Sequence, residues 1–229
     1  MKKFELVAEM SKEFFGRKLF RIRALISFGN VEKGDLGGWV EQETNLDQDG
    51  NAWVYGNAQV YGNAWVSGDA RVYGNAWVFG DAWVFGDARV YGNAWVFGDA
   101  QVYGNAWVSG DARVYGNAWV SGDARVYGNA WVSGDARVYG NAWVSGNARV
   151  FGDAHWLVVG PVGSENGFLS AFRQKDNSIM VRRGCFSGTI DEFEAAVKET
   201  HGDNEFSKEY LTLIPFIKLR LKDVEVSDD

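Results

Sequence analysis

The sequence contains few of the residues that disulfides, metal centres and sharply bent chains require. Its 229 residues include one cysteine, two histidines and two prolines. The single cysteine, Cys185, excludes an intrachain disulfide and is typical of a protein in a reducing cytosol. Because Cys185 lies in a glycine-flanked segment, we expect it to be a buried structural thiol. Two histidines without a His/Cys cluster at ligand spacing predict no metal site.

The chain also lacks a signal peptide, an apolar run of membrane length and a basic face. Its formal net charge is −7 at pH 7. Without a face rich in Lys and Arg to neutralise phosphates, duplex nucleic acid is not expected as a partner. We therefore expect a cytoplasmic protein that has no membrane partner.

The middle of the chain has no Lys, Glu or Pro between residues 51 and 154, and it consists of one repeated unit. The unit reads V-[Y/F/S]-G-[N/D]-A-[W/R/Q], with valine at every sixth position from Val54 to Val150. These seventeen valines follow one another without a slip or an insertion. A fixed short period indicates a structural array.

Each unit has the pattern of a short strand followed by a corner. Strand alternation turns Ala and Val to one side, and the residues before and after Val to the other. Gly followed by Asn or Asp favours the corner, because these residues tolerate a positive φ or bond their own backbone. Three units for each 18-residue turn give a three-sided column of nearly six coils, about 4.8 Å apart. A buried valine stabilises by about 1.5–3 kcal/mol, so stacking the coils builds a core.

The unit V-x-G-[ND]-A-x resembles the hexapeptide-repeat left-handed β-helix family. This resemblance implies left-handed winding and a homotrimer, and the best known family members are acyltransferases. The flanking segments resemble a set of small bacteriophage and prophage proteins. The resemblance lies in R-I-R-A-L and G-D-L-G-G-W-V-E before the repeats and in G-C-F-S-G-T-I-D-E-F after them. That resemblance implies a viral origin and a bacterial host cell, but no established chemistry.

The residues before the repeat, 1–50, are expected to form an N-terminal β cap. Strands are expected at residues 4–7 and 19–26. Val40 and Leu46 lie six apart, so coil formation is expected to begin there, with two extra residues near Gln48 shifting the register.

The residues after the repeat, 155–229, are expected to form a small α+β unit docked on the column. The pattern Thr189-Ile190-Asp191-Glu192 predicts a capping box at the start of a helix that ends at His201-Gly202. A second helix is expected from about 205 to 221, and strands at 155–159, 168–172 and 179–183. The fold class is thus mainly β: a left-handed triangular parallel β-helix over 51–154, with an N-terminal cap and a C-terminal α+β unit.

The outward residues form columns in which neighbours lie 18 positions apart. From residue 107 onward this spacing places Arg over Trp, a cation–π arrangement worth about 0.5–1 kcal/mol when exposed. Between residues 77 and 97 it gathers aromatic rings instead, which predicts either a contact with another copy or a host protein, or a surface covered by the terminal segments. These interface candidates are Trp77, Phe79, Trp83, Phe85, Trp95 and Phe97.

One cluster places like charges over each other, with Arg71 beneath Arg89 and Tyr73 beneath Tyr91. Stacked like charges disfavour each other unless something compensates them. One interpretation is a ligand site for a phosphate or an aromatic ring. The other is a solvated face on which Asp69 and Asp87 pair with the two arginines.

The sequence contains few residues that could act in catalysis. His155 is the only candidate base, and it is expected to take the outward position above Arg137. Nothing in the sequence brings Cys185 and His201 together, and the repeat has no protruding loop. We therefore predict a non-catalytic protein without a cofactor, phage-encoded and homo-oligomeric. It is expected to sequester a small host signal, such as a nucleotide-like molecule, or to block a host protein. The alternatives are an acyltransferase that uses His155 and acyl-CoA, and a structural component of a particle.

Overall fold

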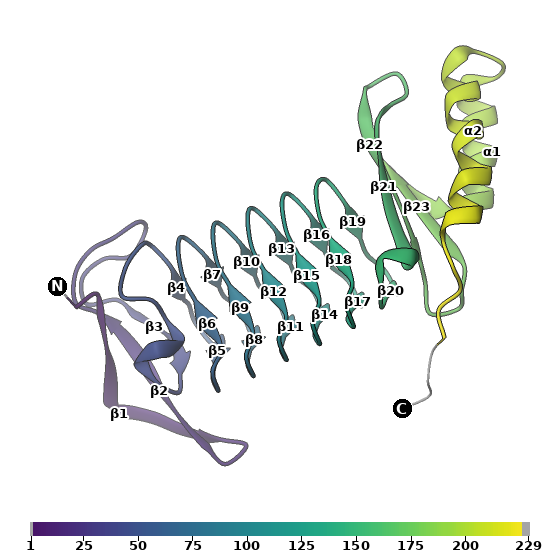
Figure 1. Ribbon diagram of the computed structural model, residues 1–229. Coiled ribbons are helices and arrows are strands. Elements are labelled where there is room, and N and C mark those ends of the chain that lie inside the picture. Colours follow the sequence, from purple (N-terminus) through teal and green to yellow (C-terminus); the bar gives the residue numbers. More distant parts are fainter. Residues whose placement is uncertain (1, 226–229) are drawn as a thin grey trace.

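The centre of the protein is a parallel β-solenoid in which each repeat unit contributes a two-residue strand (Figure 1). The computed structural model describes residues 2–225. Side one of the solenoid contains β5 (Gln59–Val60), β8 (Trp77–Val78), β11 (Trp95–Val96), β14 (Arg113–Val114), β17 (Trp131–Val132) and β20 (Arg149–Val150). Side two contains β4 (Trp53–Val54), β7 (Arg71–Val72), β10 (Arg89–Val90), β13 (Trp107–Val108), β16 (Arg125–Val126) and β19 (Trp143–Val144). Side three contains β6 (Trp65–Val66), β9 (Trp83–Val84), β12 (Gln101–Val102), β15 (Trp119–Val120) and β18 (Arg137–Val138).

The three parallel sheets confirm the three-sided coil of 18 residues. Val90, for example, pairs with Val72 on one side and with Val108 on the other. Every repeat alanine and valine from Ala52 to Val150 is at most 1% exposed, so the two inward columns form the core. The left-handed winding implied by the resemblance stays a prediction.

The corners explain why glycine recurs at a fixed place. Gly92 has φ +72°, and a Cβ atom there would lie 2.9 Å from the backbone nitrogen of Gly110 in the next coil. Both the backbone conformation and the close approach of the coils therefore require glycine. Beside the glycines, Asn side chains bond the coil above, as where Asn105 Nδ2 donates to Asp123 Oδ1 at 3.0 Å.

The N-terminal unit extends side one by an antiparallel hairpin. It contains β1 (Phe4–Phe14), β2 (Arg17–Ala24), β3 (Leu36–Val40) and the 3-10 helix η1 (Glu43–Asn45). Strand β3 joins the solenoid, with Val40 opposite Val60, and Leu46 bridges to Val66. Both pairs are 20 residues apart rather than 18, which confirms the two extra residues in the first coil.

The expected end of the first strand at residue 7 was wrong. Strand β1 continues to Phe14, because its polar second half pairs with β2 after a register shift between Val7 and Ser11. The length of β1 depends on its pairing with β2. The apolar pattern of the sequence indicates only the first half of the strand.

The C-terminal unit is an antiparallel sheet covered by two helices. The sheet contains β21 (Trp156–Val162), β22 (Gly167–Arg173), β23 (Ile179–Arg183) and β24 (Phe186–Thr189), and the helices are α1 (Ile190–His201) and α2 (Glu205–Arg220). The capping box is confirmed, since Glu192 N donates to Thr189 Oγ1 and Thr189 N donates to the Glu192 carboxylate. Strand β24 was not predicted, because its four residues include a glycine and lack alternation.

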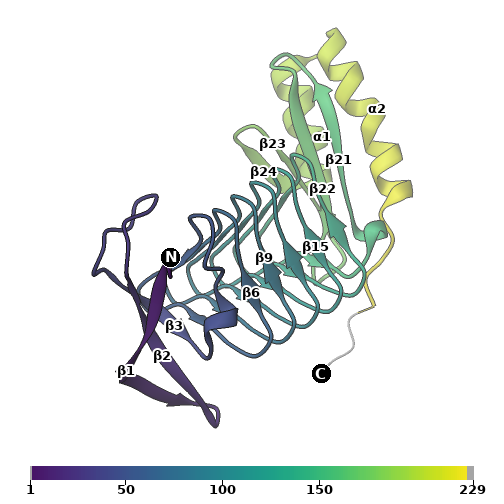
Figure 2. The ribbon, with the colours of Figure 1, turned by 60° about the vertical axis from the view of Figure 1, so that its left-hand side comes forward.

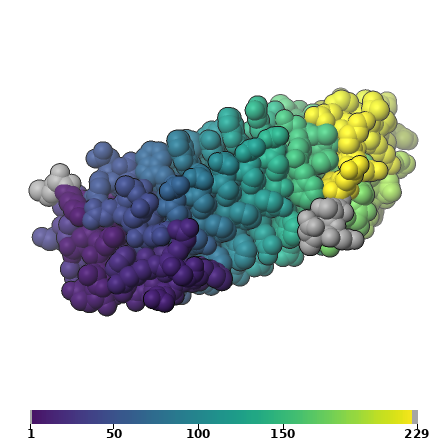
Figure 3. Space-filling model, turned by 60° about the horizontal axis from the view of Figure 1, so that its bottom comes forward, coloured from purple at the N-terminus to yellow at the C-terminus, as the bar shows by residue number. Residues whose placement is uncertain are grey.

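The C-terminal sheet closes the end of the solenoid, with the helices on its far side (Figure 2). Alternation divides β22: Leu169 and Ala171 pack in the core beneath the helices, while Phe172 belongs to the solenoid core. Trp156 joins Phe172 there. The elongated molecule thus has a unit at each end that covers an open coil (Figure 3). No helix among residues 2–225 is both long and apolar enough to cross a membrane.

Candidate functional site

The structure brings together the arginine and tyrosine cluster that the sequence singled out on side two. Arg71 and Arg89 are directly opposite in the β7–β10 pair. The rings of Tyr73 and Tyr91 stack with centroids 4.8 Å apart and an interplanar angle of 1°. Two cations and a two-ring stack therefore occupy adjacent columns of the same two coils.

This cluster lines a groove beside the N-terminal unit, which we call the cap groove. It has a volume of about 390 Å³ and is lined by Asn30, Tyr55, Arg71, Tyr73 and Arg89. Burial raises the pKa of Tyr73, aided by Tyr91 and opposed by the two arginines. Asn30 was not predicted, because it comes from the loop between β2 and β3 and lies outside the repeat.

The aromatic column is interrupted where the groove lies. On side one, Tyr61, Phe79, Phe97 and Tyr115 form an unbroken stack with centroids 4.9–5.0 Å apart. Within residues 2–225, Tyr55 forms no such stack with Tyr73, although they lie 18 positions apart; Tyr55 packs against the core instead. Among the described residues, the Tyr73 ring therefore stacks on Tyr91 alone, and its other face borders the groove.

The expected pairing of the two arginines with aspartates is not formed. Asp69 Oδ1 accepts from the backbone N and the Nδ2 of Asn51, at 3.2 and 2.7 Å. In the described part of the chain no carboxylate lies within ion-pair distance, 4.0 Å, of Arg71 or Arg89. Neither cation thus forms an ion pair, although Asp87 lines a neighbouring groove with Arg89, and a bound anion would relieve the repulsion between the two guanidinium groups.

Elsewhere the predicted cation–π ladders are confirmed, and they set Arg71 apart. The Arg113 guanidinium lies 4.6 Å from the Trp95 ring and 5.0 Å from the Trp131 ring. Arg89 has one ring, Trp107, at 5.1 Å. Arg71 has none among the described residues, because its strand partner Trp53 is buried in the core against Phe4 and Phe28.

The predicted aromatic patch is partly covered by the chain itself. Trp77 stacks on Trp95 at 4.8 Å, and the ring of Phe14, from the end of β1, lies 4.9 Å from Trp77. Trp83 remains 46% exposed on side three. The other members take part in the stacks along the columns, Phe79 with Phe97 at 4.9 Å and Phe85 with Tyr103 at 4.9 Å.

His155 does not occupy the outward position above Arg137. The chain leaves the coil after Phe151, and His155 ends the 3-10 helix η2 (Asp153–His155), while the Asp153 carboxylate accepts the Arg137 backbone N–H at 3.0 Å. The Phe151 N–H donates to His155 Nδ1 at 3.1 Å. Burial, together with the charge of Arg173, lowers the pKa of His155. The neutral ring therefore carries its proton on Nε2 and has no free lone pair with which to act as a base.

Cys185 is exposed, which corrects the expectation of a buried thiol. It lies in the turn between β23 and β24. With His201 it lines a cavity of about 260 Å³ on the C-terminal unit, whose other walls include Phe186, Phe193 and Tyr210. The exposure of Cys185 was predicted wrongly because the glycines around it, Gly184 and Gly188, indicate a tight bend but not the direction in which its side chain points. Among residues 2–225, no group of His, Cys, Asp and Glu could hold a metal ion.

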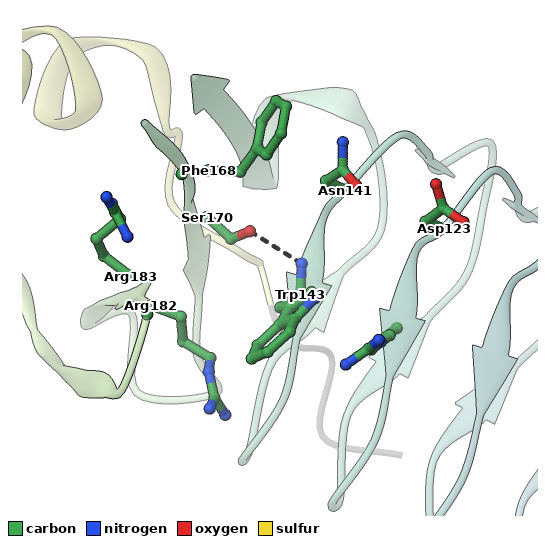
Figure 4. Close-up of a pocket in the computed structure, with 10 residues that line it drawn as sticks. Asp123, Asn141, Trp143, Phe168, Ser170, Arg182 and Arg183 are labelled. Atoms are coloured by element: carbon green, nitrogen blue, oxygen red, sulfur yellow. Dashed lines mark hydrogen bonds between the residues drawn. The ribbon is translucent and has the colours of Figure 1, made fainter. Parts of the chain in front are cut away.

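A second groove lies where the C-terminal sheet meets the last coils (Figure 4). We call it the junction pocket; its volume is about 290 Å³ and its lining includes Asp123, Arg125, Asn141, Trp143, Ser170 and Arg182. Ser170 Oγ accepts the Trp143 backbone N–H at 2.9 Å, and Arg182 lies 5.2 Å from the Trp143 ring. Sequence reasoning missed this pocket, because strands of two different units build it.

Comparison with known proteins concerns the repeat region alone. Six segments match the family described as YdcK Beta solenoid repeat, at residues 58–72, 70–86, 100–116, 107–122, 118–134 and 130–146. The curated proteins give no match to the chain. The coils between the two end units are therefore similar to the YdcK beta-solenoid repeat.

Proposed function

We propose that this β-solenoid is a non-catalytic binding protein that holds a small anionic molecule with a planar ring, of a nucleotide-like kind, in the cap groove. The observation that carries the proposal is the pair of adjacent arginines, Arg71 and Arg89, without carboxylate partners beside the unstacked face of Tyr73. Elsewhere on the solenoid, Arg113 and Arg125 each lie between two tryptophan rings, and Phe97 is stacked on both of its faces.

The two parts of such a ligand have separate places. Guanidinium groups bind phosphate oxygens through paired hydrogen bonds, and two of them at strand spacing suit a phosphate group. An aromatic ring on Tyr73 would continue the column in place of Tyr55, and stacking of this kind contributes about 1–3 kcal/mol for each base. Asn30 adds an amide at the rim, able to donate or accept a hydrogen bond.

The origin of the ligand is part of the proposal. The resemblance of the flanking segments to phage and prophage proteins supports a host metabolite or signal that the protein would sequester in the cytoplasm. The resemblance of the repeat to the hexapeptide family supports a homotrimer. An acyltransferase that uses acyl-CoA is less favoured, because His155 has no free lone pair. A purely structural particle component would not need a cationic groove.

Binding of adenosine 5′-monophosphate, adenosine and ribose 5-phosphate, measured by isothermal titration calorimetry, tests the cap groove. We expect the monophosphate to bind at least about tenfold more tightly than either part, a difference of about 1.4 kcal/mol. The variant Arg71→Gln/Arg89→Gln should lose at least that factor. Arg113→Gln is the matched control, because the Arg113 guanidinium lies between two tryptophan rings. Equal binding by the double variant and the control, or no binding of any probe, would contradict the proposal.

Self-association is proposed to use the exposed part of the aromatic patch, around Trp83. Trp83→Glu is expected to reduce the mass measured by multi-angle light scattering to that of one chain, since a charge within an apolar contact remains unpaired. Leu219→Glu is the control, because Leu219 is an exposed apolar side chain on α2, outside the patch. An unchanged mass of Trp83→Glu would remove the patch from the contact.

A further inference from the structure

We propose that the junction pocket is a second binding site, specific for a small molecule that carries an oxyanion, either a carboxylate or a phosphate ester. The site lies at the opposite end of the solenoid from the cap groove and does not depend on it (Figures 1 and 4).

The junction pocket contains hydrogen-bond donors that the chain leaves free. The Arg182 Nη1 atom donates to Ser145 Oγ at 3.2 Å, but its Nε is buried without a hydrogen-bond partner. The Arg125 guanidinium lies between the rings of Trp107 and Trp143, 4.9 Å from each, so its faces are covered and its edge N–H groups remain for a ligand. Among the described residues the Arg182 Nη2 forms no hydrogen bond, so its N–H groups also remain for an oxyanion.

The positive charge of the pocket exceeds its negative charge. Within residues 2–225, no carboxylate lies within 4.0 Å of Arg125 or Arg182. The lining holds one carboxylate, Asp123, against three arginines, of which Arg183 pairs with Glu165. The pocket is therefore locally cationic on a chain whose net charge is −7, which selects for an anion.

Arg183 follows Arg182 on β23 and borders the pocket, but its side chain turns to the other face of the sheet, toward Tyr210 (Figure 4). Its side chain pairs with Glu165 and donates to the Val162 carbonyl at 2.9 Å. Because Arg182 completes the Arg125–Trp143 column, Trp143 lies between the two guanidinium groups. We therefore assign the anion to Arg182 and to Ser170, which is opposite it in the β22–β23 pair. Arg125 adds positive charge from the other side of the ring, and Arg183 stays with the C-terminal core.

The remaining walls of the pocket suit a compact molecule with an apolar part. The Ser170 hydroxyl accepts from Trp143 N, and no acceptor for its own proton is found among the described residues, so it can donate to the anion. Trp143 and the exposed ring of Phe168 add apolar surface to the same lining. A volume of about 290 Å³ lies at the small end of ligand pockets. A small ligand with one oxyanion and one apolar or aromatic part fits this arrangement.

Phenyl phosphate, benzoate and inorganic phosphate are the probes, titrated against the full chain by calorimetry. We expect binding of at least one of the two aromatic anions, more tightly than inorganic phosphate, and the better of the two identifies the oxyanion. Arg182→Gln should weaken binding at least about tenfold, or about 1.4 kcal/mol. The cap-groove variant Arg71→Gln/Arg89→Gln should bind these probes at the junction pocket as the natural chain does, which separates the two proposals.

Because Arg182 also contacts Ser145, its variant could loosen the C-terminal unit, and a second variant avoids this. Asn141 is exposed at a corner where other coils carry Asp, so Asn141→Asp keeps the fold and adds a negative charge to the pocket wall. We expect it to weaken binding several-fold, while Asn57→Asp at a distant corner has no effect. Failure of both aromatic anions to bind, or binding unchanged in both Arg182→Gln and Asn141→Asp, would overturn the proposal.

Discussion

Val108→Asp is expected to destroy the cooperative fold of the solenoid. Val108 is 0% exposed in a middle coil and pairs with Val90 and Val126. A carboxylate there would face only alanine and valine side chains, and a buried charge without a partner costs at least about 3 kcal/mol. Each coil contacts only its neighbours, so a fault in the middle also separates the two end units that cover the core.

Urea unfolding followed by circular dichroism measures this effect, with two matched variants. Val108→Ala removes apolar contacts alone and should cost about 2 kcal/mol. Asn57→Asp introduces the same charge at an exposed corner and should change the unfolding free energy by less than about 0.5 kcal/mol. Equal stability of the aspartate and alanine variants at Val108 would show that the core admits water.

The coil itself could be predicted in detail because its determinants are local and repeated. Each unit has the same inward pair, Ala and Val, and the same Gly-Asn or Gly-Asp corner. The period of 18 residues then determines which outward residues are neighbours. The contact of Arg125 with Trp107 and Trp143 follows from counting positions alone. The same count places Arg71 opposite Arg89, as the β7–β10 pairing confirms.

The shape of both candidate sites could not be predicted, because the ends of the array build them. Asn30 reaches the cap groove from a loop, and Tyr55 departs from its column because the first coil packs against the N-terminal unit. Arg182 completes the Arg125–Trp143 column from a strand nearly forty positions later in the chain. The position of His155 was predicted wrongly for a related reason. Gly152, Asp153 and Ala154 still match the repeat pattern, although the chain has already left the coil and formed η2.

The first coil departs from the repeat in a way that only the structure explains. Asn45 is 0% exposed, and its Oδ1 accepts the backbone N–H groups of Glu41 and Gln42, at 3.1 and 3.0 Å. Its Nδ2 donates to the carbonyls of Gly62 and Ala64, both at 2.9 Å. One buried side chain thus satisfies four backbone groups where the extra residues of this coil interrupt the regular ladder.

Asn45→Asp is therefore expected to lower the unfolding free energy by at least about 3 kcal/mol at pH 7, although the side chain keeps its shape. The new carboxylate would turn an oxygen toward the Gly62 and Ala64 carbonyls, where Nδ2 now donates. Only its protonated form can donate there, so folding should raise its pKa, and the variant should lose stability as pH rises through that value. The deficit relative to the natural chain should accordingly be smaller at pH 4 than at pH 7, measured by urea unfolding at both. Asn57→Asp, at an exposed corner, is the control and should show no deficit. A deficit at Asn45 that is independent of pH would mean that lost packing, and not the exchange of a donor for an acceptor, is responsible.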